Sequence, residues 1–115
     1  MMDDPAGTAK IVVQDAPPEQ GEEIVRGFAK HSATSFGNEM TKAGYEDIPA
    51  SWLFCENDLC IPPDVQRTGI EVIEKASEKK VDVTNVKCGH MPNVTAEKET
   101  VEWIVSVARK AEAEA

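Results

Sequence analysis

The stretch Ser51–Gln66, SWLFCENDLCIPPDVQ, places an acidic loop between an apolar run and the start of a helix. Residues 52 to 55 form a short apolar run after a proline, which is typical of a strand covered on both faces. Two prolines then fix helix-like φ angles and Asp64 favours a helix N-terminus, so the pattern predicts a helix to about Lys79. Asp58 lies in the loop at this strand-to-helix junction, and a chemical role for its carboxylate requires a partner.

A second strand and helix follow the first pair. The β-branched run VDVTNV, residues 81 to 86, leads to Cys88, Gly89 and His90. Thr95 is a candidate cap for a last helix, which carries a one-sided apolar stripe of Val101, Ile104, Val105, Ala108 and Ala111. The order strand, helix, strand, helix predicts an α/β fold with parallel strands and a right-handed crossover.

The N-terminal half has weaker patterns. Residues 1–17 are predicted to be a loose N-terminal segment, with disorder before about Lys10 and at most a short strand at residues 11 to 13. Residues 18–50 are predicted to contain a helix ending near Lys30 and His31, followed by an irregular connecting region. Residues 51–115 hold the α/β segment. Because two strands do not make a stable parallel sheet, part of the sheet is expected to be missing.

Composition narrows the classes of function. The 115 residues suit one domain or part of one, and no stretch approaches the roughly 18 apolar residues that span a membrane. The acidic N-terminus does not resemble a secretory signal, so we expect a cytoplasmic protein. A net charge of −9 argues against nucleic acid and membrane surfaces as partners. Three cysteines are an odd number, which favours buried thiols over a disulfide framework.

Asp58 and His90 are the candidate catalytic residues. In open α/β sheets, functional groups gather beyond the carboxyl ends of the strands, and these two residues follow the two predicted strand ends. In a nucleophilic triad the carboxylate accepts the imidazole N–H, fixes its tautomer and stabilises the imidazolium. The spacing therefore suits the acid and the base of a triad.

The segments IPASWLFCENDLCIPPDVQ and VTNVKCGHMPNVT resemble the last two strand-loop units of the α/β-hydrolase superfamily. The resemblance is to its small-molecule esterase branch, which includes plant methylesterases and hydroxynitrile lyases. There, a C-E-x-D-x-x-I-P-P-x-x-Q motif carries the acid and a G-x-x-H-M or similar motif carries the base. Upstream, QDAPPEQ and HSATSF resemble the end of the cap region, so the resemblance covers about residues 12 to 108.

This resemblance implies that Asp58 is the triad acid and His90 the triad base, whereas Glu56 is better interpreted as a local structural acid. The chain departs from the superfamily pattern because it has no G-x-S-x-G nucleophile elbow and no early oxyanion loop. Glycines do not flank any of Ser32, Ser35, Ser51, Ser77 or Ser106 at the required spacing. The sequence is therefore predicted to be a C-terminal hydrolase segment that starts within the cap.

Simpler interpretations exist for the same residues. Asp58 can be a turn carboxylate that bonds backbone amides or caps the next helix, and His90 can be an ordinary turn histidine. His31 is predicted to lie at a helix C-terminus without a catalytic role. The potential zinc ligands are Cys55, Cys60, Cys88 and His90, but only one residue separates Cys88 from His90, which sterically disfavours binding of one ion by both. A cysteine nucleophile is also disfavoured, because Cys88 does not lie at a strand-to-helix elbow. No metal or cofactor is predicted.

The leading hypothesis is a partial α/β-hydrolase fold that carries the acid and histidine for hydrolysis of a small ester-like substrate. Alone, the chain is expected to be inactive because the serine and the oxyanion loop are missing. The alternative is a non-catalytic interaction module, or one half of a split hydrolase that a partner chain completes. An exposed parallel sheet edge favours such a partner or self-association.

Overall fold

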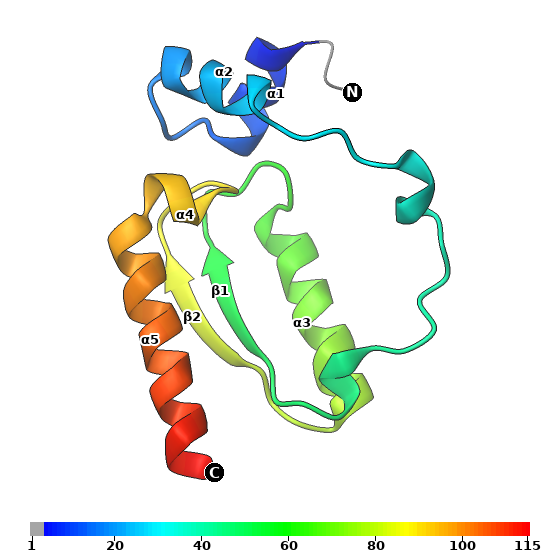
Figure 1. The fold of residues 1–115 in the computed structure, drawn as a ribbon. Helices are drawn as coiled ribbons and strands as arrows, with labels where there is room; N and C mark the ends of the chain where they lie inside the picture. Colours follow the sequence, from blue (N-terminus) through cyan, green and yellow to red (C-terminus); the bar gives the residue numbers. More distant parts are fainter. Residues whose placement is uncertain (1–3) are drawn as a thin grey trace.

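The computed structural model describes residues 4–115, and a two-stranded parallel sheet forms its centre (Figure 1). Strand β1, Ser51–Cys55, pairs with strand β2, Asp82–Val86, with Ser51 opposite Asp82 and Cys55 opposite Val86. Helix α3, Pro63–Ser77, connects the strands, and helix α5, Glu97–Glu114, follows them after the short helix α4, Pro92–Thr95. The predicted order of strand, helix, strand and helix is confirmed, as is the parallel pairing.

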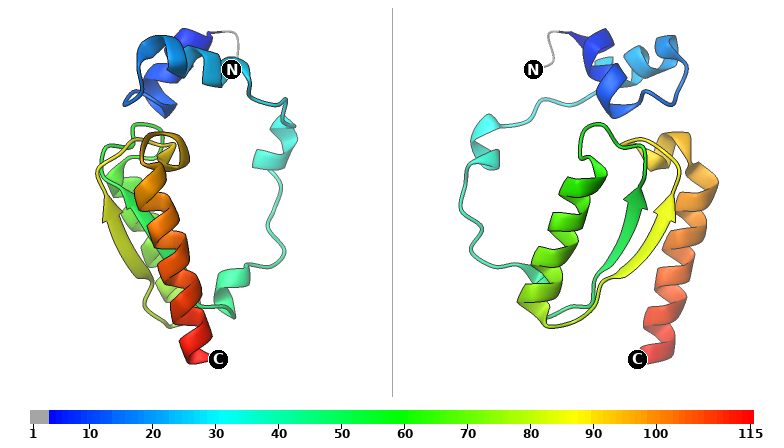
Figure 2. Two further views of the ribbon diagram at one scale, coloured as in Figure 1. Left: turned by 60° about the vertical axis from the view of Figure 1, so that its left-hand side comes forward. Right: turned by 180° about the vertical axis from the view of Figure 1, so that it is seen from behind.

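The two long helices flank the strand pair (Figures 1 and 2). Pro63 occupies the first turn of α3, where its missing N–H costs nothing. The ring of Trp52 in β1 packs over Gly69 in α3, where a Cβ atom would lie 3.0 Å from the nearest ring carbon. Lys110 of α5 bonds Asp82 of β2 through Nζ and Oδ2, which are 2.6 Å apart. These contacts join each helix to one of the strands.

Residues 5 to 26 form a helical hairpin, with helix α1 at Pro5–Val12 and helix α2 at Pro18–Arg26. Asp4 caps α1 by accepting the backbone N–H of Gly7 through Oδ1, at 2.9 Å. The hairpin has its own core of Ala9, Val13 and Val25. The prediction of a strand at residues 11 to 13 is wrong, as is the prediction of a loose segment over residues 5 to 12. The expected disorder at residues 1 to 3 lies outside the described residues.

The predicted end of one helix and the predicted N-terminal cap of another are also wrong. Helix α2 ends at Arg26, where Gly27 follows, so His31 lies in an exposed loop rather than at a helix terminus. Its ring packs against Phe36, with the ring centroids 4.9 Å apart. Thr95 is the last residue of α4, and Ala96 takes the N-cap position of α5 without a side-chain hydrogen bond.

A long exposed connection separates the hairpin from the sheet. Residues 27 to 42 arc away from the body of the chain and include the 3-10 helix Ala33–Phe36; the chain then returns to α3, which the second 3-10 helix, Gly44–Glu46, contacts (Figures 1 and 2). The predicted irregular region is confirmed here. The Cα radius of gyration is 16.0 Å, above the roughly 13 Å expected for a compact domain of this length.

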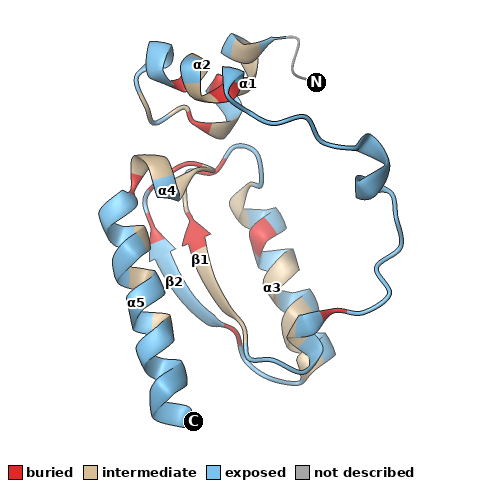
Figure 3. Cartoon of the chain, viewed as in Figure 1, coloured by how far each residue is buried: buried red, intermediate tan, exposed pale blue. Residues whose placement is uncertain are grey.

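The apolar core is divided into two small clusters. One joins Cys55, Val86, Cys88 and Ala96 at the ends of the strands, and the other is the hairpin core. Much of β2 and α5 is exposed in Figure 3. The exposed large apolar side chains include Val65 and Val72 on α3, Val83 on β2, and Val101, Ile104 and Val105 on α5. Across residues 4–115, no helix is both long and apolar enough to cross a bilayer.

Replacing Gly69 by leucine is expected to destabilise the chain by about 2 kcal/mol, because the new side chain must displace the Trp52 ring from α3. Leucine is a better helix former than glycine, so helix propensity opposes this loss. Urea unfolding followed by Trp fluorescence measures the change. Leucine at the exposed Glu71 of the same helix is the matched control, and an equal effect at both positions would contradict the packing argument.

Candidate active site

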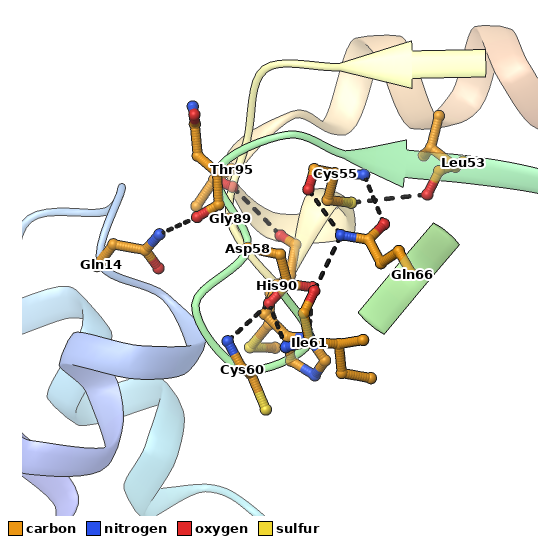
Figure 4. Close-up of polar contacts among 12 residues, drawn as sticks. Gln14, Leu53, Cys55, Asp58, Cys60, Ile61, Gln66, Gly89, His90 and Thr95 are labelled. Carbon is orange, nitrogen blue, oxygen red and sulfur yellow. Dashed lines mark hydrogen bonds and ion pairs between the residues drawn. The ribbon is translucent and has the colours of Figure 1, made fainter. Parts of the chain in front are cut away.

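Asp58 lies in the loop after β1 and divides its two carboxylate oxygens between two tasks (Figure 4). Oδ1 accepts the backbone N–H groups of Cys60 and Ile61, both at 2.8 Å. Oδ2 lies 2.9 Å from Nδ1 of His90. The residue is only 5% exposed. Asp58 therefore makes the backbone contacts of a turn carboxylate and also contacts a histidine.

His90 comes from the other strand-to-helix junction, after β2 and immediately before α4. Its side chain is 31% exposed, whereas that of Asp58 is 6% exposed, so the imidazole forms the accessible side of the pair. When Nδ1 carries the proton, it donates to Asp58 and leaves Nε2 as the basic nitrogen. None of the hydrogen bonds among residues 4–115 occupies Nε2. The geometry thus orients the basic nitrogen away from the carboxylate.

Backbone hydrogen bonds extend the sheet pairing beyond the strand ends. The N–H of Glu56 donates to the carbonyl of Val86 at 2.9 Å, and that of Asn57 donates to the carbonyl of Cys88 at 3.1 Å. The two loops therefore leave the sheet in parallel, which brings Asp58 beside His90. Sequence reasoning had placed both residues at one sheet edge, and the structure brings them into contact.

Gln66 is a buried polar side chain behind the acid loop, and it is 3% exposed. Its Nε2 donates to the carbonyl oxygens of Cys55 at 2.8 Å and Ile61 at 2.9 Å. Its Oε1 accepts from the Cys55 N–H at 3.1 Å and from the Trp52 indole at 3.3 Å. Gln66 therefore links Cys55, at the end of β1, to Ile61, at the far end of the acid loop. The residue lies within the quoted acid motif, but the sequence did not show what it bonds.

Asp15 and Gln14, between α1 and α2, also reach the site, and sequence reasoning missed both. Asp15 Oδ2 accepts the N–H of Gly89 at 2.8 Å, and Gln14 Nε2 donates to the carbonyl of Asn57 at 2.6 Å. Partial burial alone would raise the pKa of Asp15, but hydrogen bonds from Thr95 and Gly89 outweigh it and lower that pKa. Asp15 is therefore charged at neutral pH. No local motif marks either residue, because their partners lie far away in the sequence.

The cysteines have the properties of protonated thiols. Burial, followed by hydrogen bonding with the Cys55 thiol, raises the pKa of Cys88 to about 12. Burial also raises the pKa of Cys55 and of Cys60, and the charge of Asp58 contributes in both cases. A raised pKa disfavours the thiolate that nucleophilic attack or zinc binding requires. Among residues 4–115, no three His, Cys, Asp or Glu side chains gather as a metal site would require.

Thiol labelling of the folded chain at pH 7 is expected to modify Cys60 first, because Cys55 and Cys88 are buried whereas Cys60 is exposed. Mass spectrometry after a short maleimide pulse measures the sites. In denaturant all three cysteines should react. The Cys60→Ser variant should lose the fast phase, and rapid labelling of Cys88 in the folded state would contradict the burial argument.

The two other sequence candidates are not part of the pair. Glu56 Oε1 accepts from Nδ2 of Asn85 at 3.2 Å, an exposed contact between the strand ends. This contact agrees with its interpretation as a local structural acid. His31 Nδ1 lies 3.0 Å from the carbonyl oxygen of Ser32, in the exposed connection.

Comparison with known proteins gives one informative similarity. Over 85 residues the chain is 39% identical to a protein named "Probable hydrolase R7" from Phoma sp. (strain ATCC 20986 / MF5453). The match covers 74% of this chain and 35% of the relative, so this chain spans about a third of that protein's length. No family model matches the chain. The similarity is therefore to a protein named as a hydrolase, without a finer assignment.

Proposed function

We propose that this chain carries the acid and the base of a serine-type triad that hydrolyses small esters or related acyl compounds. The observation that carries the proposal is the contact between Asp58 Oδ2 and His90 Nδ1, at 2.9 Å, beyond the carboxyl ends of two parallel strands. The similarity to a protein named as a probable hydrolase supports it. The fold we propose is a partial α/β-hydrolase fold, in which residues 18–50 are the cap-end helix and connecting region.

In this mechanism His90 removes the proton from a serine hydroxyl through Nε2, and the serine oxygen attacks the substrate carbonyl. Asp58 keeps the Nδ1–H tautomer and stabilises the imidazolium that forms. His90 then gives this proton to the leaving alcohol as the bond between the carbonyl carbon and that alcohol breaks, and it next takes a proton from the water that cleaves the acyl–serine bond. These 115 residues contain no G-x-S-x-G elbow, so the serine and the oxyanion donors must come from other sequence.

A chimera tests the proposal directly. Residues of this chain replace the matched region of the Phoma protein, so that the remainder of that protein supplies the other two-thirds of the molecule. We expect the chimera to hydrolyse a small chromogenic ester such as p-nitrophenyl acetate. The chain alone is expected to show only background turnover, because it lacks the nucleophile.

The unmodified Phoma protein is the positive control for the assay. If that protein hydrolyses the ester and a folded chimera does not, the proposal for this chain is contradicted. Turnover by the chain alone at the rate of the chimera would contradict the assigned roles, because no external serine would then be needed.

The second candidate function is a non-catalytic interaction module, and the exposed apolar residues of α3, β2 and α5 favour it. Both strands also keep one edge without a partner strand among residues 4–115. Such surfaces suit a partner chain that supplies further strands. A module of this kind binds its partner without turnover, and Asp58→Ala and His90→Ala leave that binding unchanged.

A further inference from the structure

The turn between the two hairpin helices contacts both loops of the candidate site. Gln14 bonds the carbonyl of Asn57, the residue before Asp58, and Asp15 bonds the N–H of Gly89, the residue before His90. Figure 4 shows Gln14 and Gly89 beside the pair. The partners lie 43 and 74 residues away in the sequence, so these contacts exist only when the hairpin sits on the site.

Gly89 is shaped to this contact. A Cβ atom at Gly89 would lie 2.7 Å from Asp15 Oδ1 and 2.8 Å from Gln14 Oε1, closer than real Cβ contacts. Its backbone φ is not positive, so the glycine is required for close approach rather than for a left-handed conformation. A larger residue at position 89 would therefore force the side chains of Asp15 and Gln14 to shift.

The hairpin also holds the far side of His90. Met91, the next residue, packs together with Val94 against the hairpin core of Ala9, Val13 and Val25. Asp58 is fixed within its own loop by two backbone N–H groups. The carbonyl oxygens of Cys88 and Met91 accept backbone N–H groups from the Asp58 loop and from α4, and the hairpin adds contacts on both sides of His90, through Gly89 and Met91.

We propose that Asp15 and Gln14 are positioning residues that hold the His90 and Asp58 loops in the geometry of the acid and base pair. This inference rests on the proposed function for its catalytic meaning, but the positioning itself is measurable without turnover. Because Asp15 accepts a backbone N–H as a carboxylate, its bond is charge-assisted and worth more than a neutral one. The hairpin then serves as a structural support for the site.

NMR of the full chain labelled with ¹⁵N-histidine tests the proposal. The chain has two histidines, so His31 in the exposed connection is an internal reference. We expect a hydrogen-bonded Nδ1–H resonance for His90, from its bond to Asp58. In Asp15→Ala this proton should exchange with water at least about tenfold faster, as expected when a bond worth about 1.4 kcal/mol is lost. Asp47→Ala, in the exposed connection, should leave it unchanged.

Gly89→Ala provides an independent test, because it displaces Asp15 without removing it. Gly89→Ala should accelerate exchange of the His90 proton to an extent similar to Asp15→Ala. The double variant Asp15→Ala/Gly89→Ala should exchange little faster than either single variant, since both changes break the same contact between Asp15 and Gly89. Asp15→Asn, which keeps an oxygen acceptor, should restore part of the protection and covers the case in which Asp15→Ala does not fold. Unchanged exchange of the His90 proton in folded Asp15→Ala, or in folded Gly89→Ala where Asp15→Ala does not fold, would overturn the proposal.

The two proposals fail in different ways. If the chimera is inactive but the His90 proton responds to Asp15, the positioning role stands and the catalytic assignment falls. If the chimera is active and the proton does not respond, the catalytic assignment stands and the hairpin has no positioning role.

Discussion

Replacing His90 by alanine in the chimera is expected to reduce kcat for ester hydrolysis by about 10⁶-fold, because the serine loses its only proton acceptor. Replacing Asp58 by asparagine should reduce kcat by about 10⁴-fold. An asparagine keeps an oxygen for the N–H groups of Cys60 and Ile61, but it has one acceptor fewer for Nδ1–H of His90. Steady-state kinetics with the chromogenic ester measures both effects.

The smaller loss expected for Asp58→Asn separates the two residues by role. His90 moves a proton, whereas Asp58 holds a tautomer, so the chimera without Asp58 should retain more activity than the one without His90. His31→Ala is the matched control and should leave kcat unchanged, because His31 lies in the exposed connection. Retention of more than about a tenth of kcat in a folded His90→Ala chimera would refute the assigned base.

Local patterns predicted the sheet region well because they act within each element. The apolar run at residues 52 to 55, the two prolines before α3 and the β-branched run before Cys88 each indicate their element without knowledge of the rest. Parallel pairing then follows from the order of the elements, and it brings the two strand ends together. The contact between Asp58 and His90 could therefore be predicted from the sequence.

The N-terminal half was harder because packing determines it. The residues Ile11, Val12 and Val13 resemble a strand by composition, yet Val13 and Ala9 pack against Val25 of α2. The cap at Asp4 and the proline after it start the helix, and these signals were outweighed by the short apolar run. Tertiary packing overrides a weak local preference in such segments.

The supporting residues of the site escaped prediction for a related reason. Gln14 and Asp15 act through contacts across 43 and 74 residues, which no local spacing encodes. Thr95 illustrates the reverse case, because a residue type that favours helix caps lies instead at the end of α4. Sequence patterns thus located the reacting pair, whereas the structure was needed to find what holds it.

Gln66→Leu is expected to lower the free energy of unfolding by about 3 kcal/mol, because it leaves several buried polar groups without partners. Gln66 bonds both the N–H and the carbonyl of Cys55, as well as the carbonyl of Ile61. Leucine has a similar volume, so the loss is of hydrogen bonds rather than of packing. Urea unfolding of the full chain measures the effect, and leucine at the exposed Glu71 is again the control.

The Gln66→Leu substitution should also weaken the hydrogen bonding of the candidate site while the chain is still folded. Cys55 and Ile61 bracket the acid loop, and Gln66 is the side chain that bonds both. Without it, the acid loop keeps the bonds of Asp58 to Cys60 and Ile61 and those of Asn57 to Cys88 and Gln14, but it loses the side chain that joins its two ends. The Nδ1–H of His90 should therefore exchange faster in Gln66→Leu even in the absence of urea. If stability falls while that proton stays protected, Gln66 supports the strand but not the acid loop.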